Sequence, residues 1–159
     1  MKITHQKVKE LSETQLLAVS KLIDSDYDAL DFLKLSIEDL KNMEHTIVML
    51  HDDYEAFDAG IIGKYLVGFS LFKEDSPRAI STRTTIIRKE FRGSGYGNKI
   101  NTYIEDLAKK NGYKKIKCNI YTDNFASLFL KQKIGYLIVG CLRDYDAEGI
   151  DEYILVKDI

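Results

Sequence analysis

The sequence predicts a mixed α/β (α+β) domain built around one central sheet. Helical and β-type patterns alternate along the chain, which opens on a weak strand pattern and closes on a hairpin pattern. The length of 159 residues is about that of one globular domain, and 45% hydrophobic with 30% charged residues suffices for a packed core. A single proline leaves no Pro-rich linker. We therefore expect one domain over residues 1–159.

Charge and apolar patterning exclude several classes of protein. Lys plus Arg number 23 against 25 Asp plus Glu, so the net charge is −2 and no nucleic-acid partner is expected. The longest uncharged apolar run, Tyr65 to Phe72, is far below the roughly 20 residues of a membrane span. The N-terminus lacks the apolar core of a signal peptide, which favours a cytoplasmic protein with no membrane partner. Cys118 and Cys141 make neither a disulfide framework nor a zinc site, so no metal is expected.

The first third of the chain reads as a strand, two helices and a second strand. Residues 1–8 alternate weakly, as a strand would. Ser12 to Gln15 forms a capping box ahead of apolar residues at helical spacing. A second helical region is expected from about Asp28 to Met43, restarting at Ser36. The β-branched run 46–50 predicts the next strand.

The middle of the chain reads as a meander. The polar stretch from His51 to Ala59 fits no pattern. Residues 61–72 predict a hairpin with its turn at Gly63-Lys64, and Glu74 to Pro77 predicts the following turn. The β-branched run from Ile80 to Arg88 predicts a third strand of this meander.

The last third predicts a helix, a strand, a short helix and a hairpin. The helix carries one apolar stripe, formed by Ile100, Tyr103, Ile104, Leu107 and Ala108. It is followed by a strand at 115–120 and a helix at 124–133. The hairpin pairs Tyr136–Leu142 with Ile150–Val156 around a turn from Asp144 to Gly149.

A glycine-rich loop, Arg92-Gly93-Ser94-Gly95-Tyr96-Gly97, joins the predicted strand to the best helix. Backbone N–H groups at a helix N-terminus lack intrahelical partners and carry partial positive charge, so the loop suits a phosphate or pyrophosphate. Arg92 can add a charge-assisted contact. The glycine spacing fits neither a P-loop nor a dinucleotide-binding fingerprint. A glycine-rich turn that binds nothing remains the alternative from the loop alone.

Several segments resemble one known family. Arg92-x-x-Gly95-x-Gly97 resembles the R/Q-x-x-G-x-G/A pyrophosphate motif of the GCN5-related N-acetyltransferases (GNAT), which bind acetyl-CoA. Its lead-in resembles V-x-P-E-x-R-G, with Lys89 in place of proline. Residues 124–136 resemble N-x-x-A/S-x-x-L-Y-x-K-x-G-F, and 65–69 resemble x-I-V-G-F. Roughly residues 45–157 follow the element order of this family.

The resemblance implies a GNAT-like single domain whose mostly antiparallel mixed sheet is splayed at the middle and flanked by about four helices. It implies acetyl-CoA as cosubstrate. The pantetheine arm would bond to the backbone of Ile86, Ile87 and Arg88. Pyrophosphate would rest on the N–H groups of Arg92, Gly93, Ser94, Gly95, Tyr96, Gly97 and Asn98. Asn124 and Ser127 would approach pantetheine or adenosine, although Asn124 is equally suited to cap a helix.

The chemistry implied by the resemblance is direct attack of a primary amine, on a small molecule or a protein, on the thioester carbonyl. The Ile87 backbone N–H would polarise that carbonyl. The position of the usual tyrosine acid holds Lys131, which we expect to be a surface lysine or a contact to CoA phosphate rather than an acid. The strand at 80–88 has no carboxylate to serve as a base. Tyr145, in the last hairpin turn, is the remaining candidate acid, against the simpler interpretation of an exposed aromatic residue.

Other polar residues have simpler interpretations. We expect Tyr136 to pack in the core and Cys118 to be a buried structural thiol. His51-Asp52-Asp53 reads as a solvated loop rather than a metal site. The four aspartates around the first helix connection, Asp24, Asp26, Asp28 and Asp31, read as a solvated link with capping residues, although they could attract a cationic amine.

Two further functions stay open. A domain of this fold could bind CoA without catalysis, as a sensor or partner module, and a phosphate-binding regulatory domain remains if the second motif is coincidental. For an enzyme, the acceptor is expected to contact the first two helices, the stretch 51–60 and the last hairpin. The acceptor would be a small-molecule amine or a protein amino group, and a homodimer is compatible with the sequence.

Overall fold

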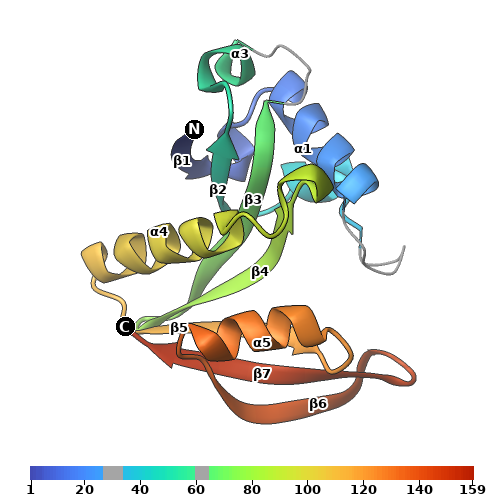
Figure 1. Ribbon diagram of the computed structural model, residues 1–159, viewed down its shortest axis with the longest axis vertical. Helices are drawn as coiled ribbons and strands as arrows, with labels where there is room; N and C mark the ends of the chain where they lie inside the picture. The colour runs from blue at the N-terminus through green and yellow to red at the C-terminus, as the bar shows by residue number, and fades with distance from the viewer. Residues whose placement is uncertain (27–33, 60–64) are drawn as a thin grey trace. The chain divides into compact units, whose positions relative to one another are not determined.

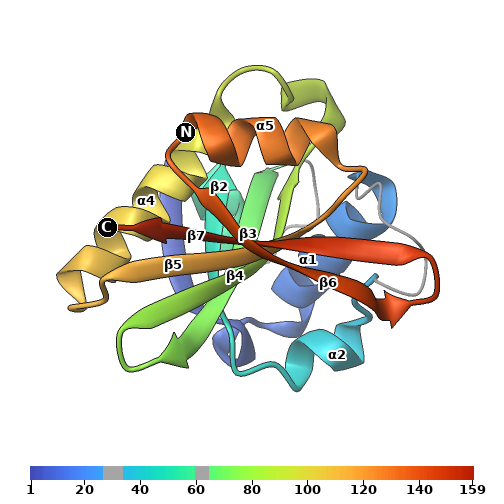
Figure 2. The same cartoon turned by 90° about the horizontal axis from the view of Figure 1, so that it is seen from below.

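The computed structural model describes residues 1–26, 34–59 and 65–159 (Figures 1 and 2). Its elements are β1 (Lys2–Lys7), η1 (Val8–Glu10), α1 (Glu13–Asp26), α2 (Ile37–Lys41), β2 (Thr46–His51), α3 (Tyr54–Asp58), β3 (Leu66–Ser76), β4 (Ala79–Ile87), η3 (Lys89–Phe91), α4 (Tyr96–Lys110), β5 (Lys115–Tyr121), α5 (Phe125–Lys133), β6 (Leu137–Ala147) and β7 (Ile150–Asp158). Across these described ranges, no helix combines the length and apolar character needed to cross a membrane.

The strands follow the hydrogen-bonded order β1-β2-β3-β4-β5-β7-β6. Pairing is antiparallel for β1–β2, β2–β3, β5–β7 and β6–β7, and parallel for β4–β5. The β4–β5 register runs from Ala79–Lys115 to Thr82–Cys118, which is the first part of β4. The predicted mixed, mostly antiparallel sheet is therefore confirmed.

The contacts divide the chain into two compact units. The first comprises Met1–Lys73 and Thr84–Ile104, and the second comprises Glu74–Arg83 and Glu105–Ile159. Each unit has its own buried side chains and is described by itself below. The extent of a single domain over 1–159 stays a prediction.

The first unit packs helices on both faces of β2 and β3. Every residue of β2 is buried, which is the pattern of a strand covered on two sides. Figure 2 shows α1 and the first turns of α4 on opposite faces of these strands. The core on the α1 face comprises apolar residues of α1, α2, α3 and β2–β4, among them Leu22, Leu40, Met49, Phe57, Phe69 and Ile86.

The helix starts of this unit follow local sequence signals. Ser12 Oγ accepts the N–H of Gln15 (3.2 Å) and Gln15 Oε1 accepts the N–H of Ser12 (2.9 Å), as the predicted capping box requires. Ser36 and Asp39 make the same reciprocal pair at the start of α2. The second helix is therefore the five residues Ile37–Lys41 within the described chain, whereas its expected beginning at Asp28 lies outside the described residues.

The second unit packs α5 against one face of β5 and β7. Both views show α5 running along these strands (Figures 1 and 2). Ile116, Cys118 and Ile120 alternate with exposed or half-buried neighbours along β5, so this strand has one covered face. Leu128 from α5 is buried in this unit, as are Tyr136 and Leu155.

Two expected turns differ from the structure, and the stretch that fitted no pattern has a defined structure. The stretch after β2 forms α3, whose N-cap Asp53 accepts the N–H of Ala56 (3.1 Å). The turn predicted at 74–77 falls at 77–78, because β3 continues through Ser76. The last hairpin turns at 148–149 and its strands reach Ala147 and Ile150, so the predicted turn at 144–149 is wrong for its first four residues. The expected strand at 61–62 and its turn at 63–64 lie outside the described residues.

Candidate active site

The glycine loop lies between η3 and α4 in the first unit. Gly93 and Gly95 have φ of 77° and 79°, a region that glycine adopts without strain, and a Cβ at either position would meet nothing within 4 Å. The first backbone hydrogen bond of the α4 ladder runs from the Lys99 N–H to the Gly95 carbonyl (3.1 Å). The preceding N–H groups of Tyr96, Gly97 and Asn98 therefore lie at the positive end of α4.

The electrostatics of this helix start favour an anion. The first turn of α4 holds no acidic residue. The loop from Arg92 to Gly95 is exposed, so its backbone is open to a ligand. Asn101 is buried behind it and donates from Nδ2 to the Gly97 carbonyl (2.9 Å), which steadies the turn. The geometry fits the diphosphate of CoA, because exposed backbone donors and positive-φ glycines are what such a group requires.

Arg92 binds backbone within the unit. Its Nε donates to the Ile87 carbonyl (3.0 Å) and its Nη2 donates to the Asp26 carbonyl. The guanidinium therefore ties the end of β4 and the end of α1 to the loop.

Asp26 completes the same connection from its side chain. The carboxylate is buried, 6% exposed, and its Oδ1 accepts the Lys89 N–H (2.6 Å) while Oδ2 accepts the Ser25 hydroxyl. Burial raises the pKa of Asp26, but these hydrogen bonds and the charges of Arg88 and Arg92 outweigh it and hold the pKa below its usual value. The interpretation of Asp26 as a solvated link residue is wrong, because its carboxylate anchors the lead-in of the loop. Asp28 and Asp31 lie outside the described residues.

The end of β4 presents alternating backbone groups. The Arg88 N–H donates to the Val67 carbonyl of β3 (2.9 Å), and Arg88 Nε donates to the Leu66 carbonyl (3.0 Å). Because successive residues of a strand direct their N–H groups to opposite sides, the Ile87 N–H points away from β3. This is the orientation that a donor to a ligand beside β4 requires.

Gly68 of β3 permits the close approach of β4. A Cβ at this position would lie 2.6 Å from the Ile86 carbonyl oxygen and 2.5 Å from Ile87 Cδ1. Only glycine fits such a contact without moving the backbone. The resemblance at 65–69 thus has a physical basis at Gly68.

The second unit holds the second motif. Asn124 Oδ1 accepts the Ser127 N–H (3.2 Å), so the structure brings these two candidates together as the N-cap and third residue of α5. Asn124 is exposed and Ser127 is half-buried. The capping role of Asn124 is confirmed.

Lys131 is buried in the second unit, 7% exposed, so the expectation of a surface lysine is wrong. Its Nζ lies 4.6 Å from the ring centroid of Tyr136, which is itself buried as predicted. Burial lowers the pKa of Lys131, while Cys118 and Glu105 raise it and Lys157 lowers it. The net shift of its pKa is downward, and the prediction that Lys131 is not the general acid stays a prediction. Cys118 is buried, and burial raises the pKa of its thiol, as a structural cysteine requires.

Tyr145 lies in β6 rather than in a turn. It falls in the segment between Leu142 and Ala147 where the β6–β7 register shifts, and its side chain is 69% exposed. The hydroxyl is therefore accessible, but the placement in a hairpin tip is wrong because β6 extends further than its sequence pattern indicates.

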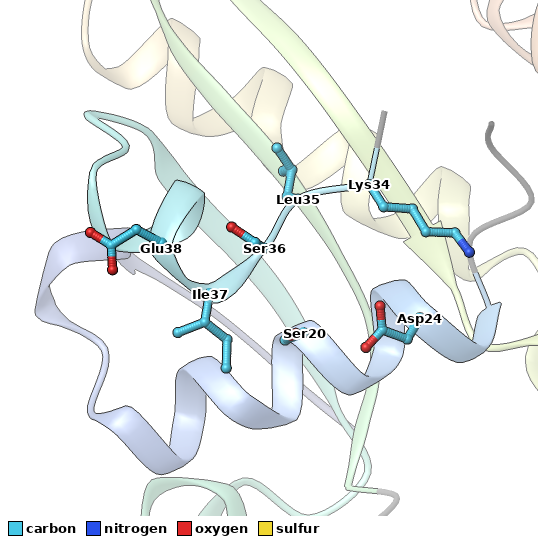
Figure 3. A pocket seen from close by; sticks show the side chains of 7 residues that line it. All are labelled: Ser20, Asp24, Lys34, Leu35, Ser36, Ile37 and Glu38. Atoms are coloured by element: carbon cyan, nitrogen blue, oxygen red, sulfur yellow. The ribbon is translucent and has the colours of Figure 1, made fainter. Parts of the chain in front are cut away.

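A hollow in the first unit lies between α1 and residues 34–38. Figure 3 shows Ser20 and Asp24 on the α1 side, facing the segment that carries Lys34, Leu35, Ser36, Ile37 and Glu38. Its volume is about 600 Å³. Asp24 and Glu38 thus border an open depression at the pair of helices expected to contact the acceptor.

Two buried polar residues escaped sequence reasoning. His51 is fully buried at the end of β2, its Nε2 is 2.8 Å from Thr4 Oγ1, and it is not part of a solvated loop. Glu152 is 6% exposed in β7. No local signal predicts the burial of His51. The only signal at Glu152 is that it interrupts the apolar pattern of its strand. Groups of three metal-binding side chains are absent from the described chain.

Comparison with known proteins identifies the family. The sequence matches the acetyltransferase (GNAT) family over residues 17–136. No curated protein gives a match. Among solved structures, the NatC complex bound to Gag peptide and CoA has a chain with TM-score 0.74 and 19% identity, over 100% of this chain and 99% of that one.

Two single-enzyme structures are similar in fold. The ribosomal-protein-S18-alanine N-acetyltransferase from Escherichia coli gives TM-score 0.73 at 14% identity, over 99% of this chain and 94% of that one. An aminoglycoside 6'-N-acetyltransferase complexed with coenzyme A gives TM-score 0.72 at 17% identity, over 99% of this chain and 97% of that one. With the family match covering most of the sequence, the chain belongs to the GNAT family and is an acetyl-CoA-dependent N-acyltransferase.

Proposed function

We propose that this protein transfers the acetyl group of acetyl-CoA directly to a primary amine of a small molecule or a protein. The observation that carries the proposal is the loop at 92–98, whose exposed backbone and positive-φ glycines precede a helix start without acidic residues. Such a loop suits a diphosphate, and the family supplies acetyl-CoA as the donor.

Each site residue has a role in this proposal. The diphosphate rests on the backbone of Arg92–Asn98, and the pantetheine arm bonds to the backbone of Ile86, Ile87 and Arg88. The N–H of Ile87 donates to the thioester oxygen as negative charge develops there. The orientation of this N–H away from β3 supports the role. Asn124 and Ser127 line the pantetheine or adenosine portion.

The reaction needs one proton removed and one proton moved. The acceptor ammonium must lose a proton before its nitrogen can attack. The nitrogen lone pair then forms the C–N bond while the C–S bond breaks, and the departing thiolate takes up a proton. The net products are the amide, CoA thiol and one proton released to solvent.

Two side chains are candidates for the donor to the thiolate. Tyr145 offers an exposed phenol, and Lys131 offers an ammonium whose pKa burial lowers toward that of a thiol. Tyr145→Phe deletes only the hydroxyl, and Lys131→Met keeps the chain length without the charge. The variant that removes the true donor should have a kcat lower by about a hundredfold or more, and the other variant should lose less than about threefold. Unchanged kcat in both would assign the proton to solvent.

The proposal covers two classes of acceptor, peptide amines and small-molecule amines. The structural neighbours include one bound to a peptide, one named for a ribosomal-protein alanine and one named for an aminoglycoside. Both peptide and small-molecule amines are therefore to be tried. The hollow between α1 and residues 34–38 has two acidic lining residues, Asp24 and Glu38, against one basic residue, Lys34, and this acidic excess favours a cationic acceptor.

The decisive experiment is thiol release from acetyl-CoA with a panel of amines, comprising N-terminal peptides, lysine peptides, aminoglycosides and polyamines. We expect turnover with at least one class, and no release with the matched N-acetylated amine. Binding of CoA without release on any amine would instead support the non-catalytic module.

A further inference from the structure

The first half of β6 exposes a run of apolar side chains. Leu137, Ile138 and Val139 follow one another along the strand and are 70%, 42% and 61% exposed. Single exposed apolar residues are ordinary on protein surfaces, whereas a contiguous group marks a place of contact with another molecule. All three residues belong to the second unit, so the surface is defined within that unit alone.

The backbone of this segment is also free on one side. β6 is the last strand in the hydrogen-bonded order and follows β7 (Figure 1). Among the described residues, β7 is the strand that pairs with it, and no strand lies along its other side. An edge strand presents a row of N–H and C=O groups there that can pair with a further strand. Backbone donors and acceptors thus lie beside the exposed apolar side chains.

The strand at the other end of the order has the usual protection against such pairing. β1 begins and ends with lysine, at Lys2 and Lys7, and also carries His5. Charged side chains on an edge, lysine above all, oppose the approach of another strand. Residues 137–142 of β6 contain no charged residue and no proline. The register shift beside Val139 is a feature that can protect an edge, but here the side chain it carries is apolar.

Both faces of this edge are apolar. Leu137 lies opposite Val156 of β7, and Ile138 lies opposite Leu155. Successive residues of a strand point to opposite faces, so Leu137 and Ile138 are exposed on different sides of the sheet. A strand placed beside β6 would therefore contact apolar side chains on both of its own faces.

The sequence of this edge is complementary to a copy of itself. Two identical strands that meet antiparallel about a two-fold axis form an isologous contact, to which the same residues contribute from both sides. When the axis lies between Val139 and Gly140, the uncharged run 137–142 of one copy lies against the same run of the other. An axis further along the strand would place the charged residues of the segment 143–146 against apolar ones. The chemistry of the run therefore selects both the occupant and the register.

We propose that a second copy of this chain pairs antiparallel with the free edge of β6, with the two-fold axis at the centre of residues 137–142. Leu137 then lies opposite Leu142 of the second copy, and Ile138 lies opposite Cys141. The backbone groups of the two edges bond to each other, and the exposed apolar side chains are removed from water. The inference goes beyond the proposed function and does not depend on it.

The size of the contact sets its strength. A standard protein interface buries about 1,600 Å² and involves roughly 20–30 residues from each partner. The paired run 137–142 is shorter than that, so the contact lies at the low end of the range. We therefore expect a reversible dimer with a Kd of about 1–100 μM. Because the two free edges of β6 occupy each other, assembly should stop at two chains.

The mass of the whole chain in solution is measured first. Sedimentation velocity is run at concentrations from about tenfold below to about tenfold above the expected Kd range. We expect the mass to rise from that of one chain to that of two chains and to go no further. A single chain at every concentration, or growth beyond two chains, would overturn the proposal.

Val139→Lys tests the edge itself. Val139 is 61% exposed, so a lysine there does not have to enter the core, and in the dimer it brings a charge close to the axis from each copy. We expect the dimer Kd to rise by about tenfold or more. Gln132→Lys adds the same charge at an exposed position of α5 and should leave the Kd within about threefold of wild type. Melting temperatures below the Kd show that both variants are folded.

Cys141 gives an independent test in the unaltered chain. It is exposed, whereas Cys118, the other cysteine, is buried. In the proposed register the Cα atoms of the two Cys141 residues lie about 11 Å apart, from a rise of about 3.4 Å per residue and a strand spacing of about 4.8 Å. A flexible bismaleimide of similar reach should therefore join two chains at concentrations above the Kd. Cys141→Ser should abolish this product.

The outcomes distinguish this surface from others. A crosslink at Cys141 that is lost in Val139→Lys and kept in Gln132→Lys supports the edge of β6. A dimer without the crosslinked product, although the reagent alkylates Cys141, would place the interface elsewhere. So would a dimer that Phe129→Lys disrupts and Val139→Lys does not, since Phe129 of α5 is 70% exposed. Either of these two results overturns the proposal.

Discussion

Charged side chains at Asp26, Lys131 and Glu152 are each less than 8% exposed. Such residues are rarely buried without partners, and here each has a defined environment. Asp26 binds the backbone of the glycine-loop lead-in, Lys131 lies over the Tyr136 ring, and Glu152 lies opposite Tyr121 in the sheet register. Their neighbours come from distant parts of the sequence, which is why local patterns assigned Asp26 and Lys131 to the surface.

At Gly95 we predict loss of CoA binding on substitution by valine. A β-branched residue is strained at φ 79°, and its side chain would occupy the open space where the diphosphate is proposed to lie. Isothermal titration with CoA should show an affinity at least about tenfold weaker, since one lost charged contact costs about 1.5–3 kcal/mol.

Gly112→Val is the matched control for this change. Gly112 has φ 84° and open space around it, and follows the C-terminus of α4. The backbone strain is similar, but the site is at the opposite end of the helix. CoA affinity equal in Gly95→Val and wild type would refute the diphosphate assignment.

His51 predicts a pH dependence of stability. Burial lowers its pKa, the charge of Lys2 lowers it further and Asp58 raises it, with a net value of about 4. Between about pH 6.5 and 4 the unfolded chain binds a proton that the folded chain does not, so the free energy of unfolding falls as the pH falls. The loss attributable to His51 is on the order of 3 kcal/mol.

Urea denaturation across this pH range measures the effect. His51→Gln removes the titration, so the gap in stability between wild type and this variant should narrow or reverse at low pH. His5→Gln changes an exposed histidine whose Nδ1 lies 2.8 Å from the Tyr103 hydroxyl, and it is measured beside His51→Gln as a second histidine variant. A constant gap between wild type and His51→Gln would contradict the prediction.

Among the elements, those with complete local signals were predictable. The capping boxes at Ser12 and Ser36 mark true helix starts, and the stripe of α4 buries Ile100, Ile104 and Ala108. The helix α3 has only five residues, too few for a periodicity, and its cap Asp53 was assigned to a solvated loop. The end of β3 has acidic residues that seldom form strands, yet Glu74 accepts the Tyr113 hydroxyl (2.9 Å) and Asp75 pairs with Lys117 (2.7 Å).

The contact of β3 with β4 gives a prediction for Gly68→Ala. The added methyl group would overlap the Ile86 carbonyl oxygen and Ile87, so β4 must move. We expect a loss of about 1–3 kcal/mol in the free energy of unfolding. We also expect kcat to fall, since displacement of a catalytic donor by about 1 Å can cost about a hundredfold.

Gly140→Ala in β6 is the control. A Cβ there would be 3.5 Å from Ile154 Cδ1, an ordinary contact, so stability and kcat should change little. Denaturation and kcat at saturating acetyl-CoA are measured for both variants. If Gly68→Ala behaves as Gly140→Ala does, the close approach of β4 is not required for its function.

For the whole molecule, binding of CoA should raise the melting temperature. A ligand at about 100 times its Kd stabilises the folded state by about 2.7 kcal/mol, which is roughly 5–10 °C for a chain of this size. Differential scanning fluorimetry measures the shift, with adenosine as a control ligand that lacks the diphosphate and pantetheine. No shift at saturating CoA would count against the loop as its site.

At this scale the family and the order of elements followed from the sequence, because two motifs stand on a strand–loop–helix and a second helix start. The acceptor site did not follow. Asp24 and Glu38, which border the hollow beside α1, share no local motif. Only the folding of α1 beside residues 34–38 brings them to one hollow.

The double attachment of Asp26 to Lys89 and Arg92 has a consequence for the kinetic order of the reaction. The last residue of α1 and the diphosphate loop cannot move independently, because both the side chain and the carbonyl of Asp26 are bonded to the loop. A donor molecule that orders the loop thereby orders the end of α1, where Asp24 borders the hollow. Thermodynamic reciprocity then requires that each substrate increase the binding affinity of the other by the same factor. We expect a sequential mechanism in which the two substrates bind synergistically. Asp26→Ala should reduce that synergy more than it reduces the binding affinity for either substrate alone.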